Sequence, residues 1–86
     1  TREDVAPHPV RGLMMLEMAG SGTARIVKRL QAMLPVTAVH TTNGTWDLIV
    51  EIGTSDLESF DAALTAIRTF EGVTRSETSL LLTSRR

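Results

Sequence analysis

Length, composition and charge confine this chain to one small domain and argue against several classes of function. Its 86 residues leave room for a single hydrophobic core, and its 9 lysines and arginines against 10 aspartates and glutamates lack the basic surplus of free-standing nucleic-acid-binding proteins. The chain has no cysteine and no apolar run near the ~20 residues of a membrane span, which excludes disulfides and fits a cytoplasmic protein with no membrane partner.

The N-terminal part predicts a lead-in followed by a strand. Residues 1–9 (TREDVAPHP) are polar and contain two of the three prolines, which is typical of a linker. The apolar run Val10–Met18 predicts a strand with apolar side chains on both faces. Leu13 and Met15 point one way, and the other face carries Val10, Met14, Leu16 and Met18.

A first helix is predicted over residues 23–34. Its apolar residues recur at helical spacing and form one stripe: Ile26, Val27, Leu30, Met33 and Leu34. Thr23 or Ser21 is available to cap the first backbone N–H groups, and Pro35 cannot continue the helix.

A β-hairpin is predicted next. Residues 36–42 (VTAVHTT) are rich in β-branched side chains and predict a strand. Residues 46–52 (WDLIVEI) form the return strand, with Trp46, Leu48, Val50 and Ile52 on one face. Asn43-Gly44 between them predicts a tight two-residue turn, because both residues tolerate positive φ.

A second helix and a last strand complete the chain. Ser55 and Glu58 fit a capping box, with Ser55 as the N-cap of a helix that runs to about Phe70. Gly72 suits a left-handed conformation at the end of this helix. Residues 73–83 (VTRSETSLLLT) predict a strand, and residues 84–86 predict a fraying tail.

The order β-α-β-β-α-β predicts the ferredoxin-like α+β fold over residues 10–83. Right-handed crossovers place both helices on one face of a four-stranded antiparallel sheet, with the second and fourth strands outermost. The opposite face carries Leu13, Met15 and Ile49, and an apolar sheet face indicates an interface. We therefore expect a homodimer formed by sheet-to-sheet packing; scattered surface hydrophobics are the alternative.

No motif for catalysis or metal binding stands out, and no cofactor is implied. His8 and His40 are too few for a His-rich metal site. Gly20-Ser21-Gly22 lacks the third glycine and the lysine of phosphate-binding loops and fits a strand-to-helix turn. Asp47 and Glu51 lie four residues apart on one strand, ~13 Å, which is too far for an acid–base pair. We therefore expect no enzyme.

Small polar groups beside the hairpin indicate a ligand site. The Asp47 carboxylate, unpaired just past the turn, can bind an ammonium group, and backbone amides and hydroxyls around Gly44 and Thr78 can hold a carboxylate. These are the two charged groups of an amino-acid ligand. Hairpin tips are also rich in such residues for structural reasons, which is the alternative.

Four segments resemble the C-terminal domain of Lrp/AsnC transcription regulators, the RAM domain (regulation of amino-acid metabolism). They are Asn43–Val50 (NGTWDLIV), Ser55–Leu57, Phe70–Val73 and Ser76–Ser79. The family pattern is a glycine, two residues, an aspartate and an apolar strand, then a capped helix, then Gly-Val and a Thr-x-Thr-type strand. Here Ser76 replaces the first threonine and keeps its hydroxyl.

The resemblance implies a domain that dimerises through its sheet, assembles further into tetramers or octamers, and binds amino-acid effectors at the dimer–dimer interface. By position, Asp47 would face the ligand amine, Gly44 would allow close backbone approach, and Thr41 would line the pocket. Thr45-Trp46 is bulkier than the usual acidic-aromatic pair, which implies a reshaped or self-occupied pocket. The resemblance links four further positions to the effector response: Leu57, Ser79, Leu80 and Leu81.

Full-length family members also carry an N-terminal DNA-binding helix-turn-helix, which residues 1–9 cannot form. We expect DNA contact only through an N-terminal domain absent from this chain. Because the chain starts with Thr1 rather than Met, we expect an excised effector domain, with a stand-alone effector-domain protein as the alternative. A small dimeric α+β-barrel enzyme shares the strand order but needs a polar pocket between helices and sheet. An ACT-like amino-acid sensor is the third candidate.

Overall fold

Six elements follow one another in the order strand, helix, strand, strand, helix, strand, as the sequence predicts. The computed structural model describes residues 9–20 and 22–81. The elements are β1 (Val10–Met18), α1 (Thr23–Gln31), β2 (Val36–Thr41), β3 (Leu48–Thr54), α2 (Leu57–Arg68) and β4 (Val73–Leu80).

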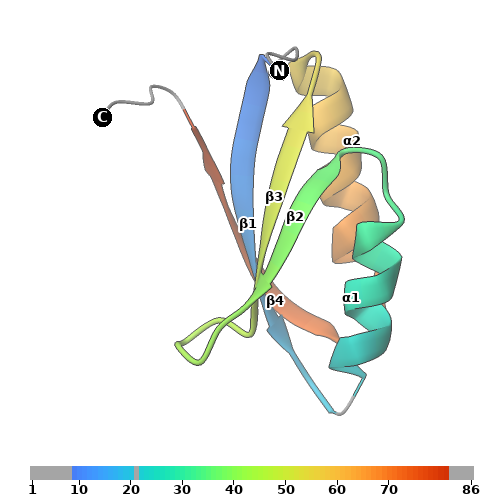
Figure 1. The fold of residues 1–86 in the computed structure, drawn as a ribbon, viewed down its shortest axis with the longest axis vertical. Helices are drawn as coiled ribbons and strands as arrows, with labels where there is room; N and C mark the ends of the chain where they lie inside the picture. The colour runs from blue at the N-terminus through green and yellow to red at the C-terminus, as the bar shows by residue number, and fades with distance from the viewer. Residues whose placement is uncertain (1–8, 21, 82–86) are drawn as a thin grey trace.

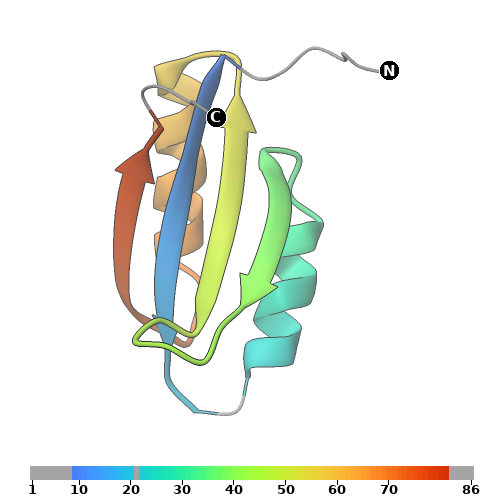
Figure 2. The ribbon, with the colours of Figure 1, turned by 60° about the vertical axis from the view of Figure 1, so that its left-hand side comes forward.

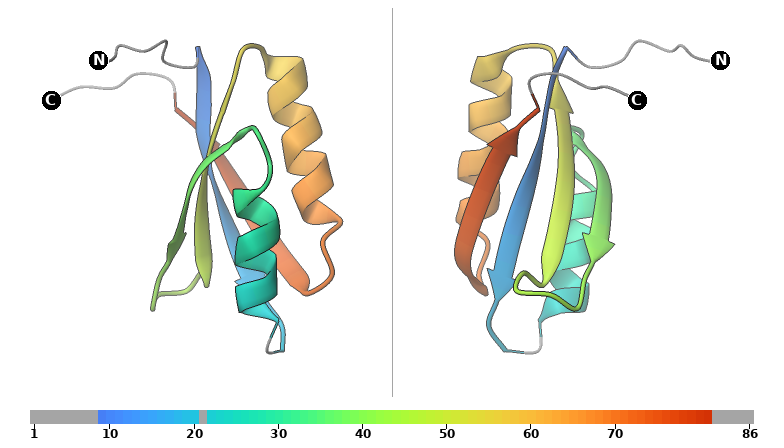
Figure 3. Two further views of the ribbon diagram at one scale, coloured as in Figure 1. Left: turned by 45° about the vertical axis from the view of Figure 1, so that its right-hand side comes forward. Right: turned by 90° about the vertical axis from the view of Figure 1, so that its left-hand side faces the viewer.

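The four strands form one antiparallel sheet in the order β2-β3-β1-β4, with β2 and β4 at its edges. Both helices cover the same face of this sheet, α1 against β2 and α2 against β3 and β1 (Figure 1). The left-hand view of Figure 3 shows the sheet nearly edge-on, with both helices of the described residues on one side of it. The predicted ferredoxin-like α+β fold is therefore confirmed. We call the uncovered side the open face.

The core lies between the sheet and the two helices. On β1, Met14 and Leu16 are fully buried, and they pair in register with Val50 and Leu48 of β3. The remaining buried apolar side chains come from both helices and from β3: Ile26, Leu30, Ile52, Phe60, Ala63, Leu64 and Ile67. As predicted, Leu13 and Met15 alternate with the core residues of β1 and lie on the open face.

Gly12 allows α2 to approach β1 closely. A Cβ atom at this position would lie 2.5 Å from Phe60 Cζ and 2.9 Å from the carbonyl oxygen of Ser79. Only a glycine leaves room for the Phe60 ring over this part of the strand. Gly12 therefore helps to set the distance between the helical layer and the sheet.

The first helix is shorter than predicted. It ends at Gln31, and the chain then turns back toward β2 through residues 32–35, where Pro35 O accepts a hydrogen bond from Gly53 N (2.9 Å). Leu34 lies in this turn and is 96% exposed, so its assignment to the apolar stripe was wrong. The N-cap is Gly22, without a side-chain cap, and not Thr23, which is the first helical residue; Ser21 lies outside the described residues.

The second helix begins one residue later than the predicted capping box. Strand β3 continues to Thr54, whose hydroxyl donates to Asp56 O (2.7 Å), and Asp56 is still extended. The N-cap is therefore Asp56, whose Oδ1 accepts a hydrogen bond from Ser59 N (2.7 Å), and not Ser55. At the other end the helix stops at Arg68, before the predicted Phe70.

A turn with a left-handed glycine leads into the last strand. Gly72 has a φ of +102°, as predicted, and a Cβ there would also press on Met18 Cε at 3.3 Å. Strand β4 then ends at Leu80. The predicted continuation over residues 82–83, the tail at 84–86 and the linker before Pro9 lie outside the described residues.

Candidate functional site

The hairpin between β2 and β3 is confirmed, but its tight Asn43-Gly44 turn is not. Among the described residues only Gly20 and Gly72 have positive φ, and six residues, 42–47, connect the strands. Thr42 closes this hairpin loop: its N–H donates to Asp47 O (3.1 Å), and its Oγ1 accepts from Gly44 N (2.9 Å). Figure 1 shows the loop on the side of the sheet away from the helices.

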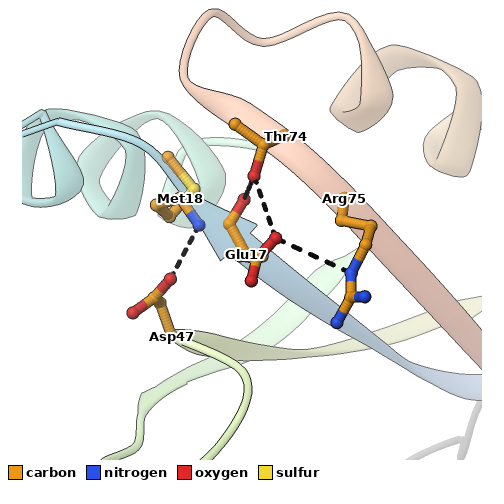
Figure 4. A network of polar contacts seen from close by, with 5 residues as sticks. All are labelled: Glu17, Met18, Asp47, Thr74 and Arg75. Atoms are coloured by element: carbon orange, nitrogen blue, oxygen red, sulfur yellow. Dashed lines mark hydrogen bonds and ion pairs between the residues drawn. The ribbon is translucent and has the colours of Figure 1, made fainter.

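Asp47 is held by β1 and is not the unpaired carboxylate that the sequence pattern indicated. Its N–H donates to Leu16 O (2.9 Å), and its Oδ2 accepts from Met18 N (2.7 Å) (Figure 4). Strand β3 begins at Leu48, so Asp47 and Trp46 lie just before it and not within the return strand predicted over residues 46–52. The carboxylate is therefore fixed in place, on an exposed residue at the end of the sheet.

Gly44 leaves part of the hairpin loop bare. A Cβ built there meets only Thr42 Oγ1, at 3.5 Å, which is ordinary van der Waals contact. Neither its φ nor its surroundings within the chain require a glycine. Its N–H donates to Thr42 Oγ1 and is not free to bind a ligand. The geometry does allow another molecule to approach this backbone closely.

Trp46 and Arg75 were not predicted to lie together. Trp46 lies outside β3, and the Arg75 guanidinium lies over its ring, 4.7 Å from the centroid. Arg75 Nε also lies 3.6 Å from Glu17 Oε1, its partner in the β1–β4 register. Thr74 Oγ1 completes this network by donating to Glu17 O (3.0 Å). No local signal connects residues 46 and 75, because only the sheet topology brings them together.

The predicted site residues lie at two ends of the sheet. Thr41 pairs with Leu48, level with Leu16 at the loop end, whereas Leu80 pairs with Gly12. Four residues separate these levels on β1, about 13 Å. Leu57, at the start of α2, and Leu81, whose N–H donates to Arg11 O (2.8 Å), belong to the end away from the loop (Figure 2).

Thr78 and Ser79 face opposite sides of β4. Thr78 pairs with Met14 on the helix side, and its Oγ1 is buried without a hydrogen-bond partner among the described residues. Ser79 pairs with Leu13 on the open face. Thr78 therefore does not join Gly44 in a carboxylate site within one chain.

The open face has an apolar centre with charged side chains around it. Met15 pairs with Ile49, and with Leu13 these half-buried side chains form the centre of the face that the right-hand view of Figure 3 turns toward the reader. His40 Nε2 and Glu51 Oε2, 2.7 Å apart, border it on one side. A hollow of about 200 Å³ at one end is lined by Arg11, Gly12, Leu13, Thr37, Glu51, Ile52 and Leu81.

Two classes of site are missing from the part of the chain that the structure covers. Residues 9–20 and 22–81 contain no group of three or more histidine and acidic side chains placed to hold a metal ion. Neither helix in these ranges is long and apolar enough to span a membrane.

The fold defines a small α+β domain of the ferredoxin-like class. At one end of its sheet, a hairpin loop carries the Asp47 carboxylate, which is hydrogen-bonded to β1. Residues 12–85 match the family described as the Lrp/AsnC ligand binding domain, so the chain belongs to this family and the resemblance is confirmed. This family is one of transcription regulators. No curated protein matches the chain significantly.

Solved structures with the same fold include short and long proteins. TTHA0845 from Thermus thermophilus has a TM-score of 0.83 at 23% identity, covering 90% of this chain and 98% of that one. E. coli AsnC has a TM-score of 0.87 at 18% identity, covering 98% and 60%. The Neisseria meningitidis transcriptional regulator NMB0573, in complex with L-Met, has a TM-score of 0.80 at 14% identity, covering 100% and 62%.

Proposed function

We propose that this chain is the effector-binding and oligomerisation domain of an Lrp/AsnC-type transcription regulator, and that its effector is an amino acid. The observation that carries the proposal is the match of residues 12–85 to the Lrp/AsnC ligand binding domain. The L-Met complex of one structural neighbour supports an amino acid as the class of ligand. Regulation of transcription in turn favours a cytoplasmic location.

The hairpin loop supplies the chemistry that an amino-acid ligand needs. A carboxylate has acceptor lone pairs on both oxygens, so Asp47 can accept from a ligand ammonium while Met18 N–H holds its Oδ2. Because Asp47 is already oriented, less side-chain entropy is lost on binding. Thr41 and Gly44 are exposed beside it and offer a hydroxyl and a bare stretch of backbone.

A complete site requires more than one copy of the chain. Leu57, Leu80 and Leu81 are exposed apolar residues at the far end of the sheet from Asp47. If all of these residues contribute to one effector site, the two ends must come from different protomers. We therefore propose a homodimer through the open face, with dimers assembled into tetramers or octamers through the hairpin loops.

We assign DNA contact to an N-terminal domain outside these 86 residues, in keeping with the near-neutral charge. The chain spans only 60% of E. coli AsnC, which fits such a longer protein. A stand-alone effector-domain protein is the second candidate, favoured by the 98% coverage of TTHA0845. Both candidates use the same effector site.

Catalysis is not part of the proposed function. The α+β-barrel enzyme alternative requires a polar residue in a pocket between helices and sheet. In the described residues that space is filled by packed apolar side chains, and the hydroxyls buried there belong to threonines: Thr54 Oγ1 donates to Asp56 O, and Thr78 Oγ1 has no hydrogen-bond partner. An ACT-like sensor is not supported either, because the family match is to a different domain.

A thermal-shift screen of the twenty amino acids tests the proposal. A ligand at a hundred times its Kd stabilises the folded state by about 2.7 kcal/mol, which raises Tm by about 10–20 °C for a domain of this size. We expect one or a few L-amino acids to give such a shift and their D-enantiomers to give none. If none of the twenty raises Tm, the amino-acid effector is wrong, while the family membership stands.

A further inference from the structure

The hairpin loop, residues 42–47, carries Asp47, the carboxylate proposed to bind the ammonium group of the effector. The loop lies outside the strands. Thr42 makes the hydrogen bonds inside the loop. Its N–H donates to Asp47 O, and its Oγ1 accepts from Gly44 N and donates to Trp46 O (3.1 Å). These contacts determine the shape of the loop. Its orientation relative to β1 and β4 depends on contacts that leave the loop.

Two neighbouring residues make those outward contacts. Asp47 bonds to the end of β1, through Leu16 O and Met18 N. Trp46 reaches further, to β4, where the Arg75 guanidinium lies over its ring at 4.7 Å. Because Trp46 and Asp47 are adjacent in the chain, these contacts hold two consecutive residues of the loop, one against β4 and the other against β1.

Arg75 is itself held from the other side. Its Nε lies 3.6 Å from Glu17 Oε1, and Thr74 Oγ1 fixes Glu17 by donating to its O (3.0 Å) and Oε1 (3.3 Å). Glu17 directly precedes Met18, and the β1–β4 register shifts between these two residues. The contacts thus form a continuous series that starts at Met18 and ends at Glu17, both on β1, and passes through Asp47, Trp46 and Arg75. Figure 4 shows these residues except Trp46.

We propose that Arg75 is a positioning residue of the effector site: through Trp46 it fixes the hairpin loop, and with it the Asp47 carboxylate. This inference rests on the proposed function, because Asp47 needs a set position only if it meets a ligand. A cation–π contact at an exposed site shifts a local equilibrium about two- to fivefold. That is enough to change how often the loop is correctly oriented and too little to decide whether the domain folds.

Trp46 is the single tryptophan of the chain, so its fluorescence reports the contact directly. Three variants are compared with the wild type, without added amino acid. Arg75→Gln removes the cation, Arg75→Lys keeps it, and Arg68→Gln, at the exposed end of α2, is the matched control. Acrylamide quenching measures the accessibility of Trp46, and hydrogen exchange of Met18 N–H measures the hold on Asp47 Oδ2.

We expect Arg75→Gln to raise the exchange rate of Met18 N–H about two- to fivefold and to increase quenching of Trp46. Arg75→Lys and Arg68→Gln should stay near the wild type, and exchange at the core residue Val50 should not change in any variant. The proposal is overturned if Met18 N–H exchanges at the wild-type rate in Arg75→Gln, or if Arg75→Lys behaves like Arg75→Gln.

Trp46→Leu tests whether the path runs through the ring. Alone it should speed Met18 N–H exchange as much as Arg75→Gln does, and the double variant should show no further increase. An additive increase would mean that Arg75 acts through Glu17 and not through Trp46, which overturns the proposal. Because no amino acid is present, a failed amino-acid screen refutes the proposed function separately from this result.

Discussion

The Asp47 carboxylate accepts a hydrogen bond of 2.7 Å from the backbone N–H of Met18, 29 residues earlier in the chain. Together with the bond from Asp47 N to Leu16 O, it continues the β1–β3 pairing beyond its last pair, Leu16 and Leu48. A side-chain oxygen thus replaces the carbonyl that a longer β3 would supply. The loop can therefore leave the plane of the sheet without leaving the Met18 donor unpaired.

Asp47→Asn separates the charge of this residue from its shape. The amide oxygen of asparagine can still accept from Met18 N–H, so we expect the fold and Tm to be retained. Binding of an amino-acid effector should weaken about ten- to hundredfold, because a charge-assisted hydrogen bond contributes about 1.5–3 kcal/mol. Isothermal titration calorimetry measures the affinity, and an unchanged Kd would remove Asp47 from the site.

Gly44→Val tests the bare surface of the hairpin loop. The space around this position is open within the chain and its φ is ordinary, so circular dichroism should show unchanged secondary structure and Tm should shift by no more than a few degrees. Assembly of dimers into larger oligomers should weaken, which sedimentation velocity detects. Wild-type sedimentation of Gly44→Val would contradict a contact at this loop.

Met15→Glu tests the homodimer through the open face. It places a carboxylate beside Ile49 and opposite Glu77, in the centre of the proposed interface. Light scattering should show a dimer for the wild type and a folded monomer for the variant, because an unpaired charge buried at an interface is costly. Leu34→Glu, at a 96% exposed position outside the sheet, is the control and should remain dimeric.

Gly12→Ala should destabilise the fold without changing its topology. The new Cβ would overlap Phe60 Cζ at 2.5 Å, and overpacking of this kind costs about 1–3 kcal/mol. Tm should then fall by at least about 4 °C. Gly44→Ala, where the added Cβ has room, is the matched control, and equal Tm values for both variants would show that α2 moves aside freely.

Asp56 makes the stability of the domain sensitive to acid. The hydrogen bond from the Ser59 backbone N–H lowers the pKa of Asp56 below its ordinary value of 3.8. A carboxylate whose pKa is lower in the folded state stabilises the fold above the unfolded pKa, and this contribution is lost as pH falls through the folded value.

Asp56→Asn keeps a good N-cap but removes the titrating group. Urea denaturation at several pH values should therefore show the wild type more stable near neutral pH, with the difference disappearing in acid. A difference that stays constant with pH would show that this carboxylate does not contribute through its charge.

The periodicity of apolar residues was sufficient to predict the fold, because the alternation of buried and exposed side chains on a strand is visible in the local sequence. Met14 and Leu16 on β1 are an example. The errors occur where a distant partner overrides a local signal. Asn43-Gly44 has the composition of a tight turn, but Asp47 bonds to Leu16 and Met18 of β1, and residues 42–47 form a longer loop. Similarly, the Ser55–Glu58 pattern fails because β3 continues to Thr54 and moves the helix start.

The candidate site was predictable in its chemistry but not in its arrangement. Glycine and aspartate near a hairpin indicate a polar loop, and that loop exists. Asp47 and Leu80 lie at opposite ends of the sheet because of which strands pair and in which register. Residue types alone do not determine this pairing. Likewise, Arg75 stacks on Trp46, 29 residues earlier in the chain, and this contact forms only when the strands have paired into the sheet.

The separation of the predicted residues between two ends of the sheet has a consequence for what such a domain senses. A pocket shared by protomers exists only after they meet, so its occupancy depends on how many copies of the protein are present as well as on the amino acid. The domain proposed here therefore responds to the concentration of the protein as well as to that of the effector. A cell that makes more of this protein also creates more sites per molecule, and the effector in turn holds the assembly together.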